Sequence, residues 1–159
     1  MGASKKKFTP DETDLKILSI LMKDAKKTYA EIGKDLFISA GTVHVRIKKM
    51  MEYNVILNAQ LQINHAKLGF DITAFLGVYL EKSRMYEKVA EELAEVDEIV
   101  EVHYTTGVYG MFVKVICRDT EHLRDIISYK VQQIEGIQRT ETFISLHNTL
   151  LRPLDVHPE

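Results

Sequence analysis

The 159-residue chain has little of several features that mark large protein classes. Its single cysteine, Cys117, excludes an internal disulfide framework and a cysteine-rich zinc site. Because Cys117 ends an apolar stretch, we expect a buried, inert thiol. No apolar run approaches the roughly 20 residues needed to cross a bilayer. No apolar stretch follows the Lys5–Lys7 run, so no secretory signal is expected. These absences predict a cytoplasmic protein without membrane contact.

Motifs of catalytic chemistry are also missing. The sequence has no nucleophile elbow, Walker loop or dinucleotide-binding glycine pattern. The glutamates between Glu87 and Glu101 fit a solvated helix face. Metal-ligand spacing is absent from the histidines His103, His122, His147 and His157. We therefore expect no enzyme, no cofactor and no metal site.

The sequence does contain an uneven distribution of charge. Residues 1–64 carry 11 Lys and Arg against 7 Asp and Glu, whereas residues 65–159 carry 10 against 16. The two parts have formal charges of +4 and −6, although the whole chain has only −2. A basic part followed by an acidic part is typical of a protein that contacts nucleic acid. A chance distribution is the alternative.

The basic part is predicted to form three short helices. Thr9 is expected to cap the first, with Pro10 in its first turn and Glu12 completing a capping box. A second capping box, from Thr28 to Glu31, begins the second helix. Ser39 is a natural N-cap for the third. Short helices joined by tight connections predict a helix-turn-helix.

The third helix has two different faces. Ala40, Val43, Ile47 and Met50 follow helical spacing and are expected to face a core. The other face is polar and basic, with small residues in its first turn. In a helix-turn-helix such a helix enters the major groove, where its first residues reach base edges and basic side chains meet phosphates. The residues expected at a DNA interface are Ser39, Ala40, Gly41, Thr42, His44, Arg46, Lys48 and Lys49. The alternative is a solvated helix face.

The period of the pattern changes after the third helix. Apolar and polar residues alternate from Asn54 to Asn64, which predicts a half-buried strand. It is either a wing that touches the DNA backbone or a strand that joins two domains. The expected division is a basic arm over 1–8, a DNA-binding domain over 9–54, a wing or linker strand over 55–70, a second domain over 71–153 and a tail over 154–159.

The second domain alternates strands with helices. Strands are predicted over 72–80, 99–106, 111–117 and 137–146, and helices from Ser83 onward and over 120–134. A short turn makes the second and third strands antiparallel. The order βαββαβ is that of the ferredoxin-like split unit, so the fold class is α+β. Because about 85 residues bury only a modest core, dimerisation through one sheet face is expected to stabilise the domain.

Three stretches resemble a known family: Gly41 to Met50 (GTVHVRIKKM), His103 to Arg118 and Gln138 to Leu146. From about Asp11 to Pro153 the chain resembles the leucine-responsive/asparagine-responsive (Lrp/AsnC, feast/famine) transcriptional regulators, most closely the asparagine-responsive type. The resemblance implies a winged helix-turn-helix, a ferredoxin-like sensor domain, and dimers that assemble into octamers or similar rings. It also implies a nucleoid-associated protein whose amino-acid effector changes assembly or DNA affinity.

By position, the resemblance places the recognition helix at Ser39 to Tyr53. It places the effector site at the turn between the second and third strands, against a neighbouring subunit's last strand. Hydroxyls and backbone N–H groups there suit a zwitterion, and Gly107 permits close approach. The leucine-responsive type has acidic residues where residues 108–110 stand here, so a small polar amino acid, asparagine first, is expected. The expected site residues are Tyr104, Thr105, Thr106, Gly107, Tyr109, Gln138, Thr140 and Thr142. The alternative is that these threonines are ordinary sheet residues.

Two positions depart from the family pattern. Phe37 stands where most relatives have glycine, so it must adopt a positive φ at a cost or form another turn. Ala40 stands where many relatives have proline. Two other functions stay open: an architectural DNA-binding protein without an effector, and an amino-acid-binding module or metabolic enzyme whose N-terminal helices bind protein.

Overall fold

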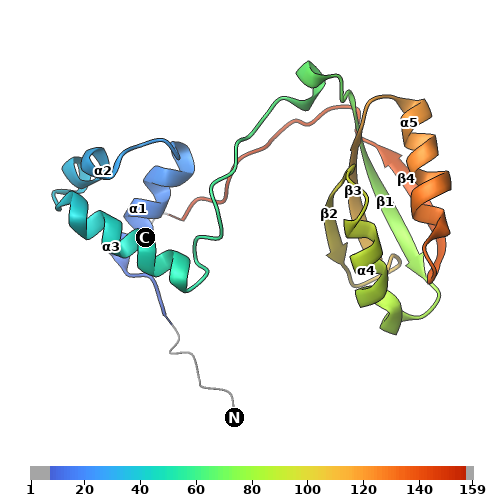
Figure 1. Ribbon diagram of the computed structural model, residues 1–159, viewed down its shortest axis with the longest axis horizontal. Coiled ribbons are helices and arrows are strands. Elements are labelled where there is room, and N and C mark those ends of the chain that lie inside the picture. The colour runs from blue at the N-terminus through green and yellow to red at the C-terminus, as the bar shows by residue number, and fades with distance from the viewer. Residues whose placement is uncertain (1–7, 157–159) are drawn as a thin grey trace, which may run out of the picture. The chain divides into compact units, whose positions relative to one another are not determined.

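The computed structural model describes residues 8–156. They divide into two compact units, one of residues 8–61 with 150–156 and one of residues 62–149 (Figure 1). Apart from Phe8, the predicted basic arm lies outside the described residues, as do residues 157–159 of the predicted tail, His157 among them. Within the described part of the chain, no helix is long and apolar enough to cross a membrane.

The N-terminal unit contains three helices, α1 (Glu12–Lys23), α2 (Tyr29–Leu36) and α3 (Ala40–Glu52). The predicted caps of α2 and α3, Thr28 and Ser39, are confirmed. The cap predicted for α1 is wrong, because Asp11 rather than Thr9 is its N-cap. A carboxylate accepts the free N–H groups as a hydroxyl does, and its charge favours the positive end of the helix dipole. The buried core of the unit is Ile17, Ile32, Val43, Ile47 and Met50.

The strand predicted over 54–64 is wrong. These residues have no regular structure beyond a turn, and all except Ile56 are exposed. Leu57 and Leu61 are 81% and 82% exposed. Alternation supplies only one requirement of a strand, since its backbone N–H and C=O groups also need a pairing partner. No strand of residues 8–156 pairs with this segment. It leads into a 3-10 turn, η1 (His65–Leu68).

The second unit contains a four-stranded antiparallel sheet. Its strands are β1 (Ile72–Leu80), β2 (Ile99–Tyr104), β3 (Met111–Cys117) and β4 (Ile137–Ile144), in the order β2-β3-β1-β4. The βαββαβ order and the antiparallel β2–β3 pair are confirmed. The bounds of β1 and β3 agree with the prediction, whereas β2 and β4 each end two residues before their predicted ends.

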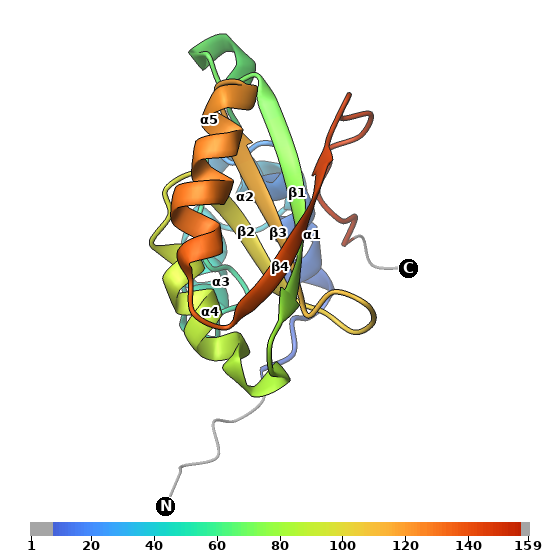
Figure 2. The same cartoon turned by 90° about the vertical axis from the view of Figure 1, so that its right-hand side faces the viewer.

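Helices cover one face of the sheet (Figure 2). The first is α4 (Tyr86–Ala94), which follows the 3-10 turn η2 (Ser83–Met85), so the α-helix begins three residues after the predicted start at Ser83. The second is continuous but irregular: α5 (Thr120–Asp125), the π-helical η3 (Ile126–Lys130) and the 3-10 turn η4 (Val131–Gln133). Their apolar sides, with Val89, Leu93 and Ile126, pack on β1 and β3 to form the core.

The other face of the sheet is aromatic. Alternation along the strands places Phe75, Phe112 and Phe143 there, opposite the helices. The ring centroids of Phe75 and Phe112 lie 5.7 Å apart, and those of Phe112 and Phe143 lie 6.4 Å apart. Phe143 is 45% exposed. This surface, which we call the aromatic face, therefore presents large apolar side chains on the outside of the unit.

Candidate DNA interface and effector site

The start of α3 is fixed by its own side chains. Ser39 Oγ accepts the N–H of Thr42 at 3.0 Å and lies 2.8 Å from the Thr42 hydroxyl. Gly33 of α2 allows the close approach of the turn, because a Cβ there would lie 2.6 Å from the carbonyl oxygen of Ile38. The first turn of α3 therefore has a defined orientation on α2.

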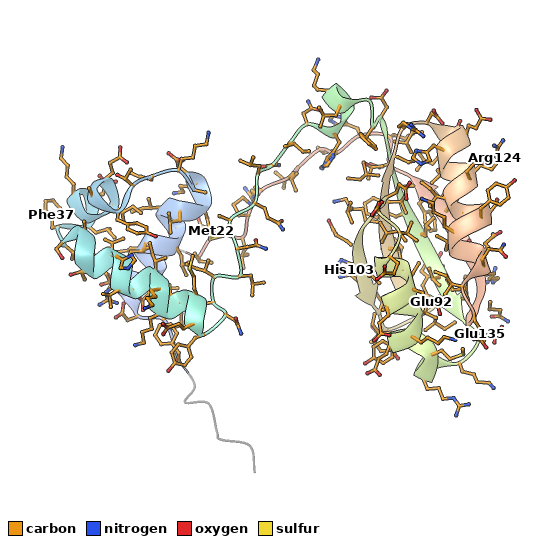
Figure 3. The ribbon with its side chains drawn as sticks, in the orientation of Figure 1. Met22, Phe37, Glu92, His103, Arg124 and Glu135 are labelled. Atoms are coloured by element: carbon orange, nitrogen blue, oxygen red, sulfur yellow. The ribbon has the colours of Figure 1, made fainter. Side chains whose placement is uncertain are left out.

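The backbone of Phe37, between α2 and α3, is left-handed. Its φ of 56° and ψ of 38° are left-handed, so it adopts the strained turn rather than another one. The side chain is 95% exposed, and Figure 3 shows it projecting from the turn between α2 and α3. A phenylalanine therefore occupies a backbone conformation that favours glycine.

The polar face of α3 is open to solvent. Gly41, Thr42, His44, Lys48 and Lys49 are all exposed. Ala40 is exposed as well, so the expectation that it faces the core is wrong, whereas Val43, Ile47 and Met50 are buried as predicted. Ala40 directly follows the N-cap Ser39 and so precedes the buried positions of α3, which begin at Val43. The exposed face can accept a partner along its whole length.

Two residues of this face have aromatic neighbours. The Lys49 ammonium lies 4.5 Å from the centroid of the Phe8 ring, and Phe8 in turn packs on Tyr53 at 5.1 Å. The His44 ring lies 5.5 Å from that of Tyr29. These contacts support the side chains of α3 from both flanks while leaving their polar ends exposed.

Arg46 is engaged inside the unit. Its Nη1 donates to Asp11 Oδ2 and to Asp14 Oδ1, each at 2.8 Å. The hydrogen bond from Arg46, together with the N–H of Asp14, lowers the pKa of Asp11 below its ordinary value. We call this group the Arg46 clasp (Arg46, Asp11 and Asp14). Sequence reasoning expected Arg46 to be available to phosphate and missed both carboxylates, whose positions follow from the packing of α1 on α3.

A groove runs along the same side of α3. Its volume is about 820 Å³, and it includes both carboxylates of the clasp and several of the expected DNA-binding residues. The lining residues are Phe8, Thr9, Asp11, Asp14, Ser39, Gly41, Thr42, Val45, Arg46 and Lys49.

The expected effector turn is clamped by hydrogen bonds. The N–H of Thr105 donates to the carbonyl of Gly110 at 3.0 Å, and the Thr105 hydroxyl donates to the carbonyl of Tyr109 at 2.7 Å. Gly107 has a φ of 107°, which suits glycine. Thr106 and Gly107 are exposed, and Tyr104 stacks on Tyr86 with ring centroids 4.3 Å apart.

Tyr109 lies over the sheet rather than beside the turn. Its hydroxyl donates to Glu141 Oε2 at 2.8 Å, and Tyr79 donates to Glu141 Oε1 at 2.9 Å. Its ring occupies the space above Gly77, where a Cβ would lie 2.5 Å from ring atoms. These hydrogen bonds, that from Tyr109 first, lower the pKa of Glu141. Sequence reasoning missed Glu141 and Tyr79, since only the strand order brings them to Tyr109.

Within one chain the expected turn reaches β4 through Tyr109, whose hydroxyl donates to Glu141 of that strand. The turn follows β2 at one edge of the sheet, whereas β4, with Gln138, Thr140 and Thr142, forms the other edge. Thr140 and Thr142 also lie opposite Val78 and Leu76, on the helix-covered side. The Tyr109 ring lies above Gly77 on the other face of the sheet, so within one chain Thr140 and Thr142 do not share a side with it.

Metal and thiol chemistry receive no support from residues 8–156. No group of three or more His, Cys, Asp or Glu in that range could hold a metal ion. Cys117 is buried, and its burial raises the pKa of the thiol. A raised pKa keeps it protonated and unreactive.

Comparison with known proteins agrees with both halves of this description. The chain matches the winged helix-turn-helix DNA-binding family over residues 10–56 and the Lrp/AsnC ligand binding domain over residues 73–154. The regulatory protein AsnC of Haemophilus influenzae is 43% identical over 148 residues, covering 93% of this chain and 97% of the relative. The structure of Escherichia coli AsnC has a TM-score of 0.86 at 36% identity, covering 93% of this chain and 99% of that one. A Neisseria meningitidis transcriptional regulator in complex with L-methionine shares the fold, with a TM-score of 0.84 at 17% identity, covering 91% and 94%. The chain therefore belongs to the Lrp/AsnC family of DNA-binding transcriptional regulators.

Proposed function

We propose that the protein binds double-stranded DNA through α3 and that an amino acid controls this binding. The observation that carries the proposal is the exposed polar and basic face of α3. Thr42 and His44 lie near its start, where they reach base edges, and Lys48 and Lys49 lie farther along, where they meet phosphates. In a dimer, two such helices enter successive major grooves about 34 Å apart.

The amino-acid effector binds between sensor domains of neighbouring subunits. The exposed turn at Thr106 and Gly107 supplies one half of its site and β4 of a second subunit supplies the other. Asparagine is the first candidate, because the turn carries no acidic residue and the chain resembles proteins named AsnC. The methionine complex of a protein with this fold supports an amino acid as the ligand class. The effector acts by binding two assembly states with different affinity.

The aromatic face is the proposed contact between two copies of the chain. Its phenylalanines lie on the outside of the sensor unit, and aromatic residues are enriched in the cores of interfaces between subunits. Further association of dimers into an octamer or similar ring brings the effector half-sites together. The proposed place of action is the cytoplasm, on the nucleoid.

Salt dependence tests the DNA interface. The affinity of the protein for duplex DNA, measured by fluorescence anisotropy over a range of salt, is expected to fall as salt rises. Replacing Lys48 by alanine is expected to reduce the slope of log K against log salt by about 0.9, the effect of one lost phosphate contact. Lys26→Ala, an exposed lysine in the turn after α1, is the matched control and leaves the slope unchanged. Equal slopes for the two variants would remove Lys48 from the interface.

Sedimentation with a panel of amino acids tests the effector. Asparagine is expected to shift the assembly of the wild-type protein, and Gly107→Val to abolish that shift while DNA binding persists. Gly69→Val is the matched control, because Gly69 also has a positive φ (84°) and open space around it but lies outside the turn. No shift with any amino acid would contradict an effector and favour an architectural DNA-binding protein.

A further inference from the structure

The N-terminus of α1 and the middle of α3 are joined by a closed set of hydrogen bonds. The N–H of Asp14 donates to Asp11 Oδ1 at 2.9 Å, and the N–H of Asp11 donates to Asp14 Oδ2 at 3.1 Å. Arg46 Nη1 occupies the remaining oxygen of each carboxylate. All four oxygens are therefore used, and one guanidinium on α3 completes the capping box of α1.

Burial makes Arg46 necessary to this arrangement. Asp14 is only 3% exposed, and a buried carboxylate needs a paired cation with good hydrogen-bond geometry. The Arg46 side chain is itself 30% exposed, so the pair lies at the edge of the core rather than in solvent. The contact thus fixes α3 relative to α1 at a point beside the buried Ile47.

The location of the clasp is unexpected for a protein that binds a polyanion. Asp11 and Asp14 line the same groove as Gly41, Thr42 and Lys49 of α3. Two carboxylates and one guanidinium give the clasp a net charge of −1. A negative charge beside a DNA interface opposes binding by simple electrostatics, so its presence there needs a compensating benefit.

Resting on the proposed DNA-binding function, we propose that Arg46 is a positioning residue of the DNA interface that acts through Asp11 and Asp14. The clasp sets the rotation of α3 on α1, and this rotation decides whether Thr42 and His44 reach base edges. Phosphate contact falls instead to Lys48 and Lys49, whose side chains are exposed on α3. The clasp therefore contributes to sequence preference more than to total charge.

Asp14→Asn separates this proposal from electrostatics by the sign of its effect. The substitution removes a negative charge beside the DNA, so electrostatics alone predicts tighter binding. Loss of the clasp predicts the opposite: at least tenfold weaker binding to a duplex that the wild-type protein selects from a random pool. Binding to a shuffled duplex of the same composition is expected to change little. Tighter binding to both duplexes would overturn the proposal.

Arg46 variants provide a second test, which compares the preference for the selected duplex with the salt dependence of binding. A loss of stability alone would not change these two quantities in different ways. Arg46→Ala is expected to reduce the preference for the selected duplex and leave the slope of log K against log salt unchanged. Arg46→Lys keeps the charge but not the planar fork, so it restores the preference only in part. A slope reduced by about 0.9 in Arg46→Ala would show a direct phosphate contact instead.

Controls keep the test informative if a variant unfolds. Asp24→Asn makes the same charge change at the exposed C-cap of α1 and is expected to leave the preference intact. Circular dichroism of each full-length variant reports whether the helices persist. If Asp14→Asn loses its helices, Asp11→Asn carries the test, because Asp11 is 56% exposed and is expected to show a smaller loss of the same sign. A wild-type protein with no preference between the duplexes would refute the proposed function rather than the clasp.

Discussion

The two units of the molecule are stabilised in different ways. Among residues 8–156, the core of the sensor unit has fourteen buried residues, whereas that of the N-terminal unit has five. Backbone strain is distributed unevenly too. Among the described residues, each positive-φ position of the sensor unit, at 69, 107 and 136, is a glycine, but those of the N-terminal unit are Phe37 and Asn54. In the helical unit the Arg46 clasp differs from an exposed surface pair, because its Asp14 carboxylate is buried.

Partly buried ion pairs occur in both units. In the sensor unit Lys130 Nζ donates to both oxygens of Glu98, at 2.9 and 2.8 Å, and His122 Nε2 lies 3.1 Å from Glu98 Oε1. Lys130 ends the π-helical turn, a type of irregularity that often marks a local constraint. This network sits beside a large apolar core, whereas the Arg46 clasp sits beside a small one.

The largest expected effect comes from matched core truncations, which test whether the two units differ in stability. Ile17→Ala and Leu76→Ala each remove a fully buried side chain and should each cost about 2–5 kcal/mol. The same cost is expected to unfold the N-terminal unit but not the sensor unit, because the former has less stability to lose. Hydrogen exchange followed by peptide should show α1–α3 unprotected in Ile17→Ala while β1 and β3 stay protected. Equal loss of protection in both units would mean that they unfold together.

The second prediction concerns the stability of the sensor unit in acid, which should depend on Glu98. Burial raises the pKa of Glu98, but hydrogen bonds from Lys130 and His122 outweigh burial, so its pKa lies below the ordinary value. A carboxyl whose pKa is lowered by folding stabilises the folded state above its unfolded pKa of about 4.3, and this contribution is lost as pH falls through the lower folded pKa. Stability of the sensor unit should therefore fall below about pH 4, and Glu98→Gln should flatten that fall.

The matched control for the acid experiment is Glu121→Gln, a change of the same kind at an exposed side chain on α5. Thermal melts of both variants over the acid range give the measurement. A decline as steep in Glu98→Gln as in the wild type would exclude the network as its source.

Local patterns in the sequence predicted the strands of the sensor unit better than they predicted the contacts between its residues. The bounds of β1 and β3 were predictable because a run of β-prone residues faces a core on one side and is bounded by turns. The segment from Asn54 to Asn64 has the same alternation but no partner strand, so the same rule gave a wrong strand. Alternation reports a face that can be buried, not the neighbour that buries it.

Contacts between distant segments were the part that could not be predicted. Asp14 could not be singled out, because nothing near it in the sequence indicates that Arg46 lies beside it. Glu141 became part of the Tyr109 contact only through the strand order and the register of β4 on β1. The exposure of the polar face of α3 was predictable because its residues are local to one helix. Whether the effector half-sites combine as expected stays a prediction.

The smallest expected effect tests the strain in the N-terminal unit. Phe37 has a φ of 56°, where a Cβ is disfavoured by roughly 1–2 kcal/mol, and replacing it by glycine removes that penalty. Glycine also increases the freedom of the unfolded chain, which costs about 0.5–1 kcal/mol. Since the Phe37 ring is 95% exposed and contributes little packing, Phe37→Gly should stabilise the unit by about 0.5 kcal/mol. Asn54→Gly is the matched comparison, because asparagine tolerates this conformation and its replacement should gain less. Denaturant melts that rank Phe37→Gly above Asn54→Gly would show that the helical unit carries strain in its turn, and the reverse order would place the strain elsewhere.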